Sequence, residues 1–303
     1  MIKDKHANIF YDLATLCDAG ISILDAAKRV AASHSNIKAW SSVIAMLERG
    51  NKLSLALGKH GLISRYEQEV ISVAEYAGRT SEGLRNISNS YDKRRLRISR
   101  LKSKLYYPFA ILVVGILVSS ILQIARNPEL SKITVLSQAI FVLFTAILAT
   151  KAMLNLMQKD ACSWLSFAKQ HSSSEWYKMQ FQQVVFGALL WHISSGIDFK
   201  TGFTRIAKLI DAKIVQKKLK LASNYCANGL SVTNAVQQAK LPITREFNQI
   251  LLTGEQSGRW EGSVRKFLEQ NEFLLDQRID NAFEWAPRIY YGVIVLMVIA
   301  VII

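Results

Sequence analysis

The distribution of apolar and polar residues along the chain predicts a membrane hairpin. Residues 105–125 carry no charged side chain, and a second apolar run covers residues 133–157, interrupted by Lys151. A helix needs about 20 mostly apolar residues to cross the hydrocarbon core of a bilayer, and both runs satisfy this length. Only residues 126–132 separate them, so both helices would cross the same membrane in opposite directions. The segments before and after the hairpin then lie on the same side.

A third apolar run covers residues 289–303, directly after Pro287 and Arg288. Its length is at the short limit for a spanning helix. Trp285 precedes it, and such aromatic side chains favour the interface between membrane and water. We therefore predict a third transmembrane helix over residues 287–303.

The polar segments, residues 1–104 and 158–286, have the periodicity of amphipathic helices. In the first segment, Phe10 and Leu13 recur at helical spacing, and Gly20 follows where a C-terminal cap would stand. Similar patterns predict about six helices in each segment. The expected fold is therefore all-α, with two helical bundles and three transmembrane helices.

The distribution of charge predicts which side of the membrane each segment faces. The chain has 38 Lys and Arg against 23 Asp and Glu, a net charge of +15. A basic cluster lies just before the first apolar run: Lys93, Arg94, Arg95, Arg97, Arg100, Lys102 and Lys104. Because cytoplasmic flanks of membrane spans are enriched in Lys and Arg, we expect both bundles and the N-terminus in the cytoplasm, the C-terminus on the outer, periplasmic side, and anionic lipid beside the cluster.

The two polar segments also repeat one pattern, with matched residues 176 to 180 positions apart. The matched pairs are Phe10 and Phe186, Gly20 and Gly196, Gly50 and Gly229, Glu75 and Glu255, Gly78 and Gly258, Arg79 and Arg259, and Pro108 and Pro287. Each unit is thus a bundle followed by a proline and a spanning helix. The helix of residues 133–157 is the additional element, which returns the chain to the first side.

The order of these motifs resembles the type II secretion F domain, which occurs twice in inner-membrane platform proteins of type II secretion systems and type IV pili. The residues that carry the resemblance in the first copy are Phe10, Leu13, Leu16, Ala19 and Gly20, then Gly50, Leu53, Ser54, Ala56 and Leu57, then Ala74, Glu75 and Gly78, and finally Tyr107 and Pro108. Ala74 departs from the family pattern, which has glycine there. The short chain is similar to the type IVb or thin-pilus branch.

The resemblance and the patterns together define the predicted organisation. It consists of a first F domain at 1–104, a transmembrane helix at 105–125, an external loop at 126–132, a transmembrane helix at 133–157, a second F domain at 158–286 and a transmembrane helix at 287–303. The resemblance implies a bacterial inner-membrane platform without enzymatic activity or cofactor. Its implied partners are a cytoplasmic assembly ATPase, pilin or pseudopilin, other inner-membrane assembly proteins and further copies of the chain.

Two other functions stay open. A small-molecule transporter would need paired ionisable residues or Gly- and Pro-broken helices near the middle of the membrane, and the apolar runs lack them. A membrane-anchored nucleic-acid binder would use the basic cluster, although its place beside a span favours anchoring. The sequence shows no catalytic, cofactor or metal motif.

The matched acids Glu75 and Glu255 are the most distinctive polar residues. Each could be structural, bridging two helices beside a glycine cap, or could form a contact edge for a partner or a cation. The candidates for partner contact are Glu75, Arg79, Glu255, Arg259, Arg94, Arg95 and Arg97.

Overall fold

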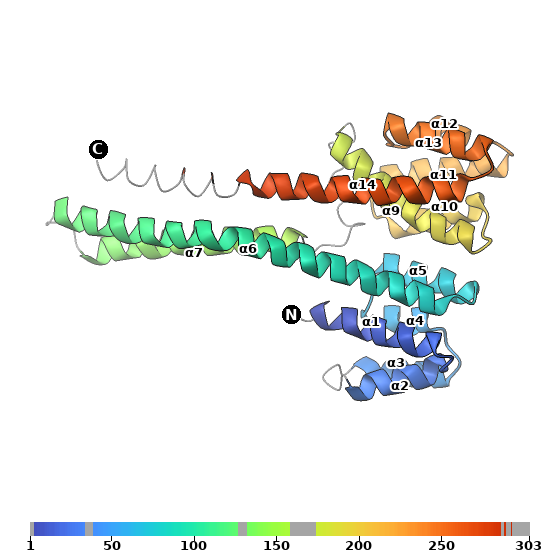
Figure 1. The fold of residues 1–303 in the computed structure, drawn as a ribbon, viewed down its shortest axis with the longest axis horizontal. Coiled ribbons are helices and arrows are strands. Elements are labelled where there is room, and N and C mark those ends of the chain that lie inside the picture. The colour runs from blue at the N-terminus through green and yellow to red at the C-terminus, as the bar shows by residue number, and fades with distance from the viewer. Residues whose placement is uncertain are drawn as a thin grey trace. The chain divides into compact units, whose positions relative to one another are not determined.

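The computed structural model describes residues 3–33, 39–126, 132–157 and 174–285, with residues 288 and 292 (Figure 1). Every regular element in these ranges is an α-helix, which confirms the all-helical prediction. The chain divides into two compact units. The first unit comprises Met1–Lys93 and Asp160–Leu275, and the second comprises Arg94–Lys159 and Asp276–Ile303.

The N-terminal half of the first unit is built from five helices and the start of a sixth. They are α1 (Lys3–Asp18), α2 (Ile23–Ser33), α3 (Ala39–Glu48), α4 (Leu53–Lys59), α5 (Arg65–Tyr76) and α6 (Thr80–Arg126). Their apolar faces enclose one hydrophobic cluster, here called the N-terminal core. Its largest fully buried side chains are Phe10, Leu13, Leu53, Leu57, Ile71 and Leu84.

Six helices of the C-terminal half enclose a second cluster, here called the C-terminal core. They are α9 (Glu175–Ser194), α10 (Phe199–Leu209), α11 (Lys213–Ala227), α12 (Val232–Gln238), α13 (Arg245–Gln256) and α14 (Trp260–Phe283). The ring of Phe186 lies edge-on to that of Phe247, with centroids 4.6 Å apart, and also edge-on to Phe203. Such pairs add to the stabilisation that burial of the rings already provides.

The second unit contains the apolar helices. Among the described residues, α6 is the one helix long and apolar enough to cross a membrane, with a mean hydropathy of 2.3 over its best window. α6 continues without interruption from the bundle through Pro108 to Arg126. The run predicted as the second span forms α7 (Lys132–Met157), whose exposed side chains include Phe141 and Phe144. The predicted third transmembrane helix, residues 287–303, lies outside the described residues, apart from Arg288 and Gly292.

Glycines end the helices where the sequence pattern predicted caps. Gly78 follows α5 with φ +68°, a left-handed conformation that costs glycine little. The next residue, Arg79, donates its N–H to the Ala74 carbonyl at 2.8 Å, as in a Schellman motif. Gly258 has φ +67° after α13. The matched glycines therefore terminate the two helices that carry the matched glutamates.

Candidate functional site

Helix α5 and helix α9 meet where the two cores of the first unit adjoin. Tyr66, near the start of α5, packs against both cores. Trp191, near the end of α9, packs against the N-terminal core. We call this contact, with Tyr66, Glu69, His192 and Arg205, the seam.

A buried ion pair lies in the seam. His192 Nε2 is 2.9 Å from Glu69 Oε1, and the His192 side chain is only 1% exposed. Arg205 Nη1, on α10, approaches the same carboxylate oxygen at 3.5 Å. One acid of the N-terminal half therefore faces two basic groups of the C-terminal half.

His192 is held by two hydrogen bonds. Its Nδ1 is 2.8 Å from the Ala188 carbonyl oxygen, which can only accept, so Nδ1 carries a proton and donates it. Its Nε2 lies 2.9 Å from Glu69 Oε1. The imidazole ring is therefore oriented by the backbone of its own helix and by an acid of α5.

The partners of Glu69 lower its pKa. Burial works to raise the pKa of its carboxyl, but the hydrogen bond and charge of His192, with the charge of Arg205, outweigh burial and bring the pKa below its ordinary value. The seam therefore favours the ionised form of Glu69. A buried pair of this kind disfavours separation, because either partner alone would leave an uncompensated charge.

Two further contacts cross the seam. Arg79 Nη1 donates to the backbone oxygen of Ser194 at 3.2 Å. Ser194 is the last residue of α9, so the guanidinium lies at the negative end of a helix dipole. Arg65 contacts Asp211 at 3.2 Å, but both side chains are more than 70% exposed, so solvent screens this pair.

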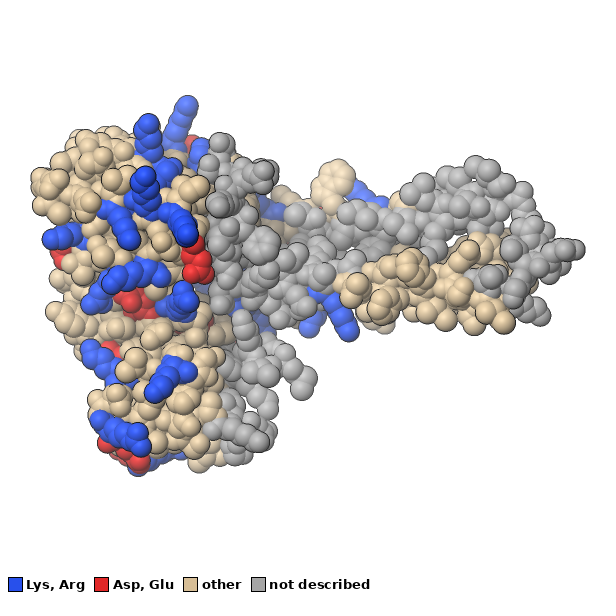
Figure 2. Space-filling model, turned by 180° about the vertical axis from the view of Figure 1, so that it is seen from behind, with Lys and Arg blue, Asp and Glu red and all other residues tan. Residues whose placement is uncertain are grey.

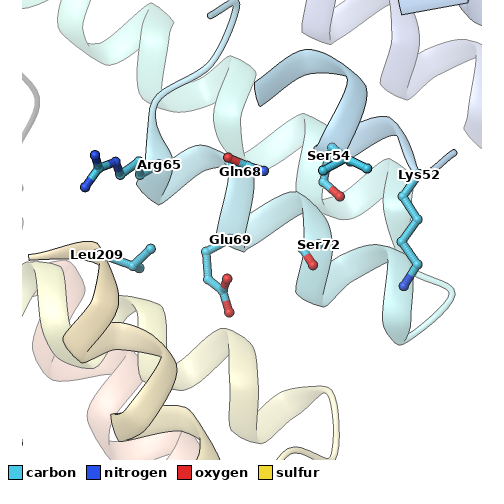
Figure 3. Close-up of a pocket in the computed structure, with 8 residues that line it drawn as sticks. Lys52, Ser54, Arg65, Gln68, Glu69, Ser72 and Leu209 are labelled. Carbon is cyan, nitrogen blue, oxygen red and sulfur yellow. The ribbon is translucent and has the colours of Figure 1, made fainter. Parts of the chain in front are cut away.

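A cavity of about 490 Å³ lies beside the seam (Figure 3). Most of its lining comes from α4 and α5, and Leu209 contributes from α10. Figure 3 shows Arg65 and Leu209 toward one end, Lys52 at the other, and Glu69 between them. This cavity is open and mixes both signs of charge, so it favours no single class of ligand.

Glu75 holds the start of another helix. Its Oε1 accepts the N–H of Leu53 at 2.6 Å, and its Oε2 accepts the N–H and the hydroxyl of Ser54. Leu53 and Ser54 are the first residues of α4, whose N–H groups have no partner within the helix. Lys52, the residue before α4, provides no side-chain cap, so Glu75 supplies it from α5.

Glu255 makes equivalent contacts with backbone N–H groups in the C-terminal half. Its carboxylate accepts the N–H groups of Val232 at 2.8 Å and Thr233 at 3.1 Å, at the start of α12. Burial works to raise the pKa of Glu255, but hydrogen bonds from Thr233, Val232 and Ser231 outweigh burial and lower it. The structural interpretation of both glutamates thus has a direct geometric basis, and contact with a partner or cation stays a prediction.

The arginines predicted as partner contacts have different surroundings. In the second unit, Arg97 forms an ion pair with Asp276, and both side chains are about three-quarters buried. Arg94 is half-buried, whereas Arg95 and Arg259 are exposed. Arg97 is therefore occupied within the chain, and a contact of the other arginines with a partner stays a prediction.

The acidic partner of Arg97 belongs to a series along α6 and α14. In the first unit, Lys93 Nζ lies 2.7 Å from Glu272. In the second unit, Arg100 lies 3.7 Å from Asp280. Part of the basic cluster before the first apolar run is thus neutralised by acids of α14, which are 179 or 180 positions later in the sequence.

The departure at Ala74 also has a structural explanation. A Cβ on Gly83, on α6, would lie 2.6 Å from the Ala74 Cβ. In the C-terminal half, the residue that matches Ala74 is Gly254, and a Cβ there would lie 3.1 Å from the Ser263 Cβ. At each helix crossing, a glycine therefore faces a small residue. In the N-terminal half the glycine is on α6, the second helix of the pair, and in the C-terminal half it is on α13, the first helix of the pair.

Sequence reasoning identified Glu75, Glu255 and Arg79 but missed the seam pair. His192 has no neighbour in the sequence that would indicate a site, and Glu69 is 123 positions away. A histidine at the end of an apolar stretch of α9 is a local signal, but the residue it faces depends on how α5 and α9 pack.

The comparisons with known proteins agree with the pattern of motifs. A family model described as Type II secretion system (T2SS), protein F, matches residues 9–125. The matched range covers the helices around the N-terminal core and almost all of α6. No curated protein matches the chain.

Proposed function

We propose that this chain is a membrane platform protein of a secretion or pilus system, because a family model for protein F of the type II secretion system matches residues 9–125. It couples a cytoplasmic assembly ATPase to the extraction and polymerisation of pilin or pseudopilin subunits. The observation that carries the proposal is this match, because it includes both the bundle helices and the apolar part of α6.

The continuity of α6 supports a coupling role. α6 has 47 residues, packs Leu84 and Ile87 into the N-terminal core, and ends at Arg126 beyond the apolar segment. A helix transmits a displacement along its axis better than a flexible linker does. A movement of the bundle would therefore reach the membrane through α6.

The second F domain, at residues 158–286, is part of the same proposal. Its support is the equivalent capping by Glu75 and Glu255, and the matched left-handed glycines after α5 and α13. Three spanning helices, with both bundles in the cytoplasm of a bacterial inner membrane, complete the arrangement. Association with further copies, with other inner-membrane assembly proteins and with anionic lipid belongs to this role.

Deletion of the gene tests the function. Loss of surface fibres or of secretion, with pilin or pseudopilin still synthesised and inserted in the membrane, is the expected result. Restoration by the wild-type chain is the control for effects on neighbouring genes. Normal fibres and normal secretion in the deletion strain would contradict the proposal, as would ATP hydrolysis by the purified chain alone.

Thiol labelling tests the topology, but the native cysteines are poor reporters. Burial raises the pKa of the Cys17 thiol, and burial with nearby acids raises the pKa of Cys226 to about 11, so little reactive thiolate forms at either. Cys162 lies outside the described residues. We therefore choose the exposed positions Ser42→Cys and Gln238→Cys. Both should react with a membrane-impermeant reagent only after the membrane is opened, and labelling of intact cells would contradict the cytoplasmic placement.

A further inference from the structure

Helix α11 has an unusual distribution of charge. It contains Lys213, Lys217, Lys218 and Lys220 and no acidic residue. Residues 200–240 together hold eight Lys and Arg against one acid, Asp211. Figure 2 shows one side of the molecule on which Lys and Arg side chains gather over the bundles. The positive charge of the chain is therefore not confined to the flanks of its apolar runs.

The lysines lie on the solvent side of α11. Its core face consists of Val215, Leu219 and Ala222, which are buried at helical spacing. Lys213, Lys217 and Lys220 follow one another at spacings of four and three, so they share the opposite face. All three are exposed. Packing of the C-terminal core therefore does not require them.

Neighbouring groups do not neutralise these charges. Lys218 donates its ammonium to the Lys240 backbone oxygen at 2.7 Å. Within the part of the chain that the structure describes, Lys213, Lys217 and Lys220 form no ion pair. Like charges four residues apart destabilise a helix, so this arrangement has a cost that an external negative surface would remove.

The equivalent helix of the N-terminal half has fewer lysines. With Gly50 matched to Gly229, Ala39 and Ser41 of α3 correspond to Lys218 and Lys220. Helix α3 contains no basic residue. In the same register Lys217 corresponds to Lys38, which lies outside the described residues, so the comparison indicates a role outside the fold for Lys218 and Lys220 only.

Two aliphatic side chains lie among the lysines. Ile214 is 54% exposed and Leu221 is 38% exposed, and they fall on the same face as Lys217. Apolar anchors within a charged rim are typical of protein interfaces. A lipid surface favours a broader apolar face with aromatic residues, and single-stranded nucleic acid favours aromatic stacking, and this face offers neither. A second copy of the chain is disfavoured because its own net charge is +15.

We propose that the exposed face of α11, formed by Lys213, Ile214, Lys217, Lys220 and Leu221, docks on an acidic surface of the assembly ATPase. The identity of the partner rests on the proposed function. The new element is the binding site, which this inference places on α11 in the C-terminal half of the chain. Opposite charges accelerate the encounter, and the aliphatic residues become buried on contact.

The test measures the affinity of the full chain, in nanodiscs of zwitterionic lipid, for the purified ATPase of the same system. Lys217→Glu with Lys220→Glu should weaken binding about tenfold or more at low salt, because like charges would then face each other. Lys217→Arg with Lys220→Arg should preserve binding. Ile214→Ser should weaken it at all salt concentrations, since it removes an apolar contact.

The matched control is Lys59→Glu with Lys266→Glu, which makes the same change of charge at two other exposed positions. It should bind as the wild type does, and near-UV circular dichroism should show that all variants are folded. Equal weakening in the control, or unchanged affinity after reversal at α11, would overturn the inference while leaving the platform function intact. Failure of the wild-type chain to bind the ATPase would overturn both.

Two further probes separate other partners. Vesicles rich in phosphatidylglycerol and a DNA duplex are each tested against the wild type and the Lys217→Glu, Lys220→Glu variant. Loss of binding to either probe in the variant, with ATPase binding unchanged, would assign the surface to lipid or nucleic acid and overturn the inference. Loss confined to the ATPase would support it.

Discussion

His192 and Glu69 form a buried ion pair, 2.9 Å between Nε2 and Oε1, at the contact of the two cores in the first compact unit. The pair brings together α9 and α5, which lie in the two halves proposed to be F domains. This contact has a defined geometry, because a hydrogen bond between the imidazole ring and the carboxylate forms only in a narrow range of distances and angles. We therefore expect the pair to fix how the two cores pack.

Loss of the Glu69 charge should destabilise the chain and change its response to acid. Because the pKa of Glu69 in the folded chain is below its ordinary value of 4.5, its contribution to stability is complete above that pH. This contribution is lost as the pH falls through the lowered pKa. Glu69→Gln should reduce stability by about 2–4 kcal/mol near neutral pH and flatten the acid dependence. Thermal unfolding of the full chain in detergent, followed by tryptophan fluorescence, measures both.

The control for this experiment is Glu82→Gln. Glu82 pairs with Arg79 on the surface, and its side chain is 52% exposed, so its removal should cost less than about 1 kcal/mol. Equal effects of the two substitutions would show that the seam pair contributes no more than a surface pair.

The two capping glutamates should differ in importance. Glu75→Ala should cost about 1–2 kcal/mol, because the first N–H groups of α4 then lose their acceptor and Lys52 offers none. Glu255→Ala should cost less, since the Ser231 hydroxyl also accepts the N–H of Asn234 in α12. Hydrogen exchange localised to α4 and α12 measures each effect. Faster exchange in α12 than in α4 would contradict this order.

Sequence patterns predicted the elements because their signals are local. Helical spacing of apolar residues and a glycine after each helix depend on neighbours within a few positions, as with Phe10, Leu13 and Gly20. The match between Glu75 and Glu255 also singled out two residues that each accept hydrogen bonds at the start of another helix. It could not show that Glu75 reaches Leu53, because that contact joins two helices 22 positions apart.

The seam and the ion pair of Arg97 could not be predicted from the sequence for the same reason. Asp276 is 179 positions from Arg97, so a basic cluster before a membrane span gave no sign of an internal partner. The lysines of α11 were visible in the sequence. Only the structure shows that they share one exposed face of the helix, which distinguishes them from the other basic residues of the chain.

Exchange of the small residues at a helix crossing should be reversible. Gly83→Ser alone should destabilise the chain by about 1–3 kcal/mol, because its Cβ would lie only 2.6 Å from that of Ala74. Adding Ala74→Gly should recover most of this loss, since Gly254 and Ser263 already form that combination in the C-terminal half. Thermal unfolding of both variants decides the matter. A double variant as unstable as Gly83→Ser alone would mean that the two crossings differ in geometry.

The ion pair between Arg97 and Asp276 should be measurable by charge exchange. Arg97→Asp or Asp276→Arg alone should destabilise the full chain by about 1–3 kcal/mol, because each side chain is only 27% exposed and would face a like charge. The double exchange should restore part of the stability, and the coupling between the two substitutions gives the strength of the pair. Thermal unfolding in detergent measures all four proteins.

The same exchange at Lys93 and Glu272 is the matched comparison. The Lys93 side chain is 59% exposed, so solvent screens this pair, and its coupling should be below about 1 kcal/mol. Independent effects of Arg97→Asp and Asp276→Arg, with no coupling, would show that the basic cluster is free to serve another partner. A strong coupling would instead assign Arg97 to joining α6 to α14, the two helices that lead toward the predicted spans.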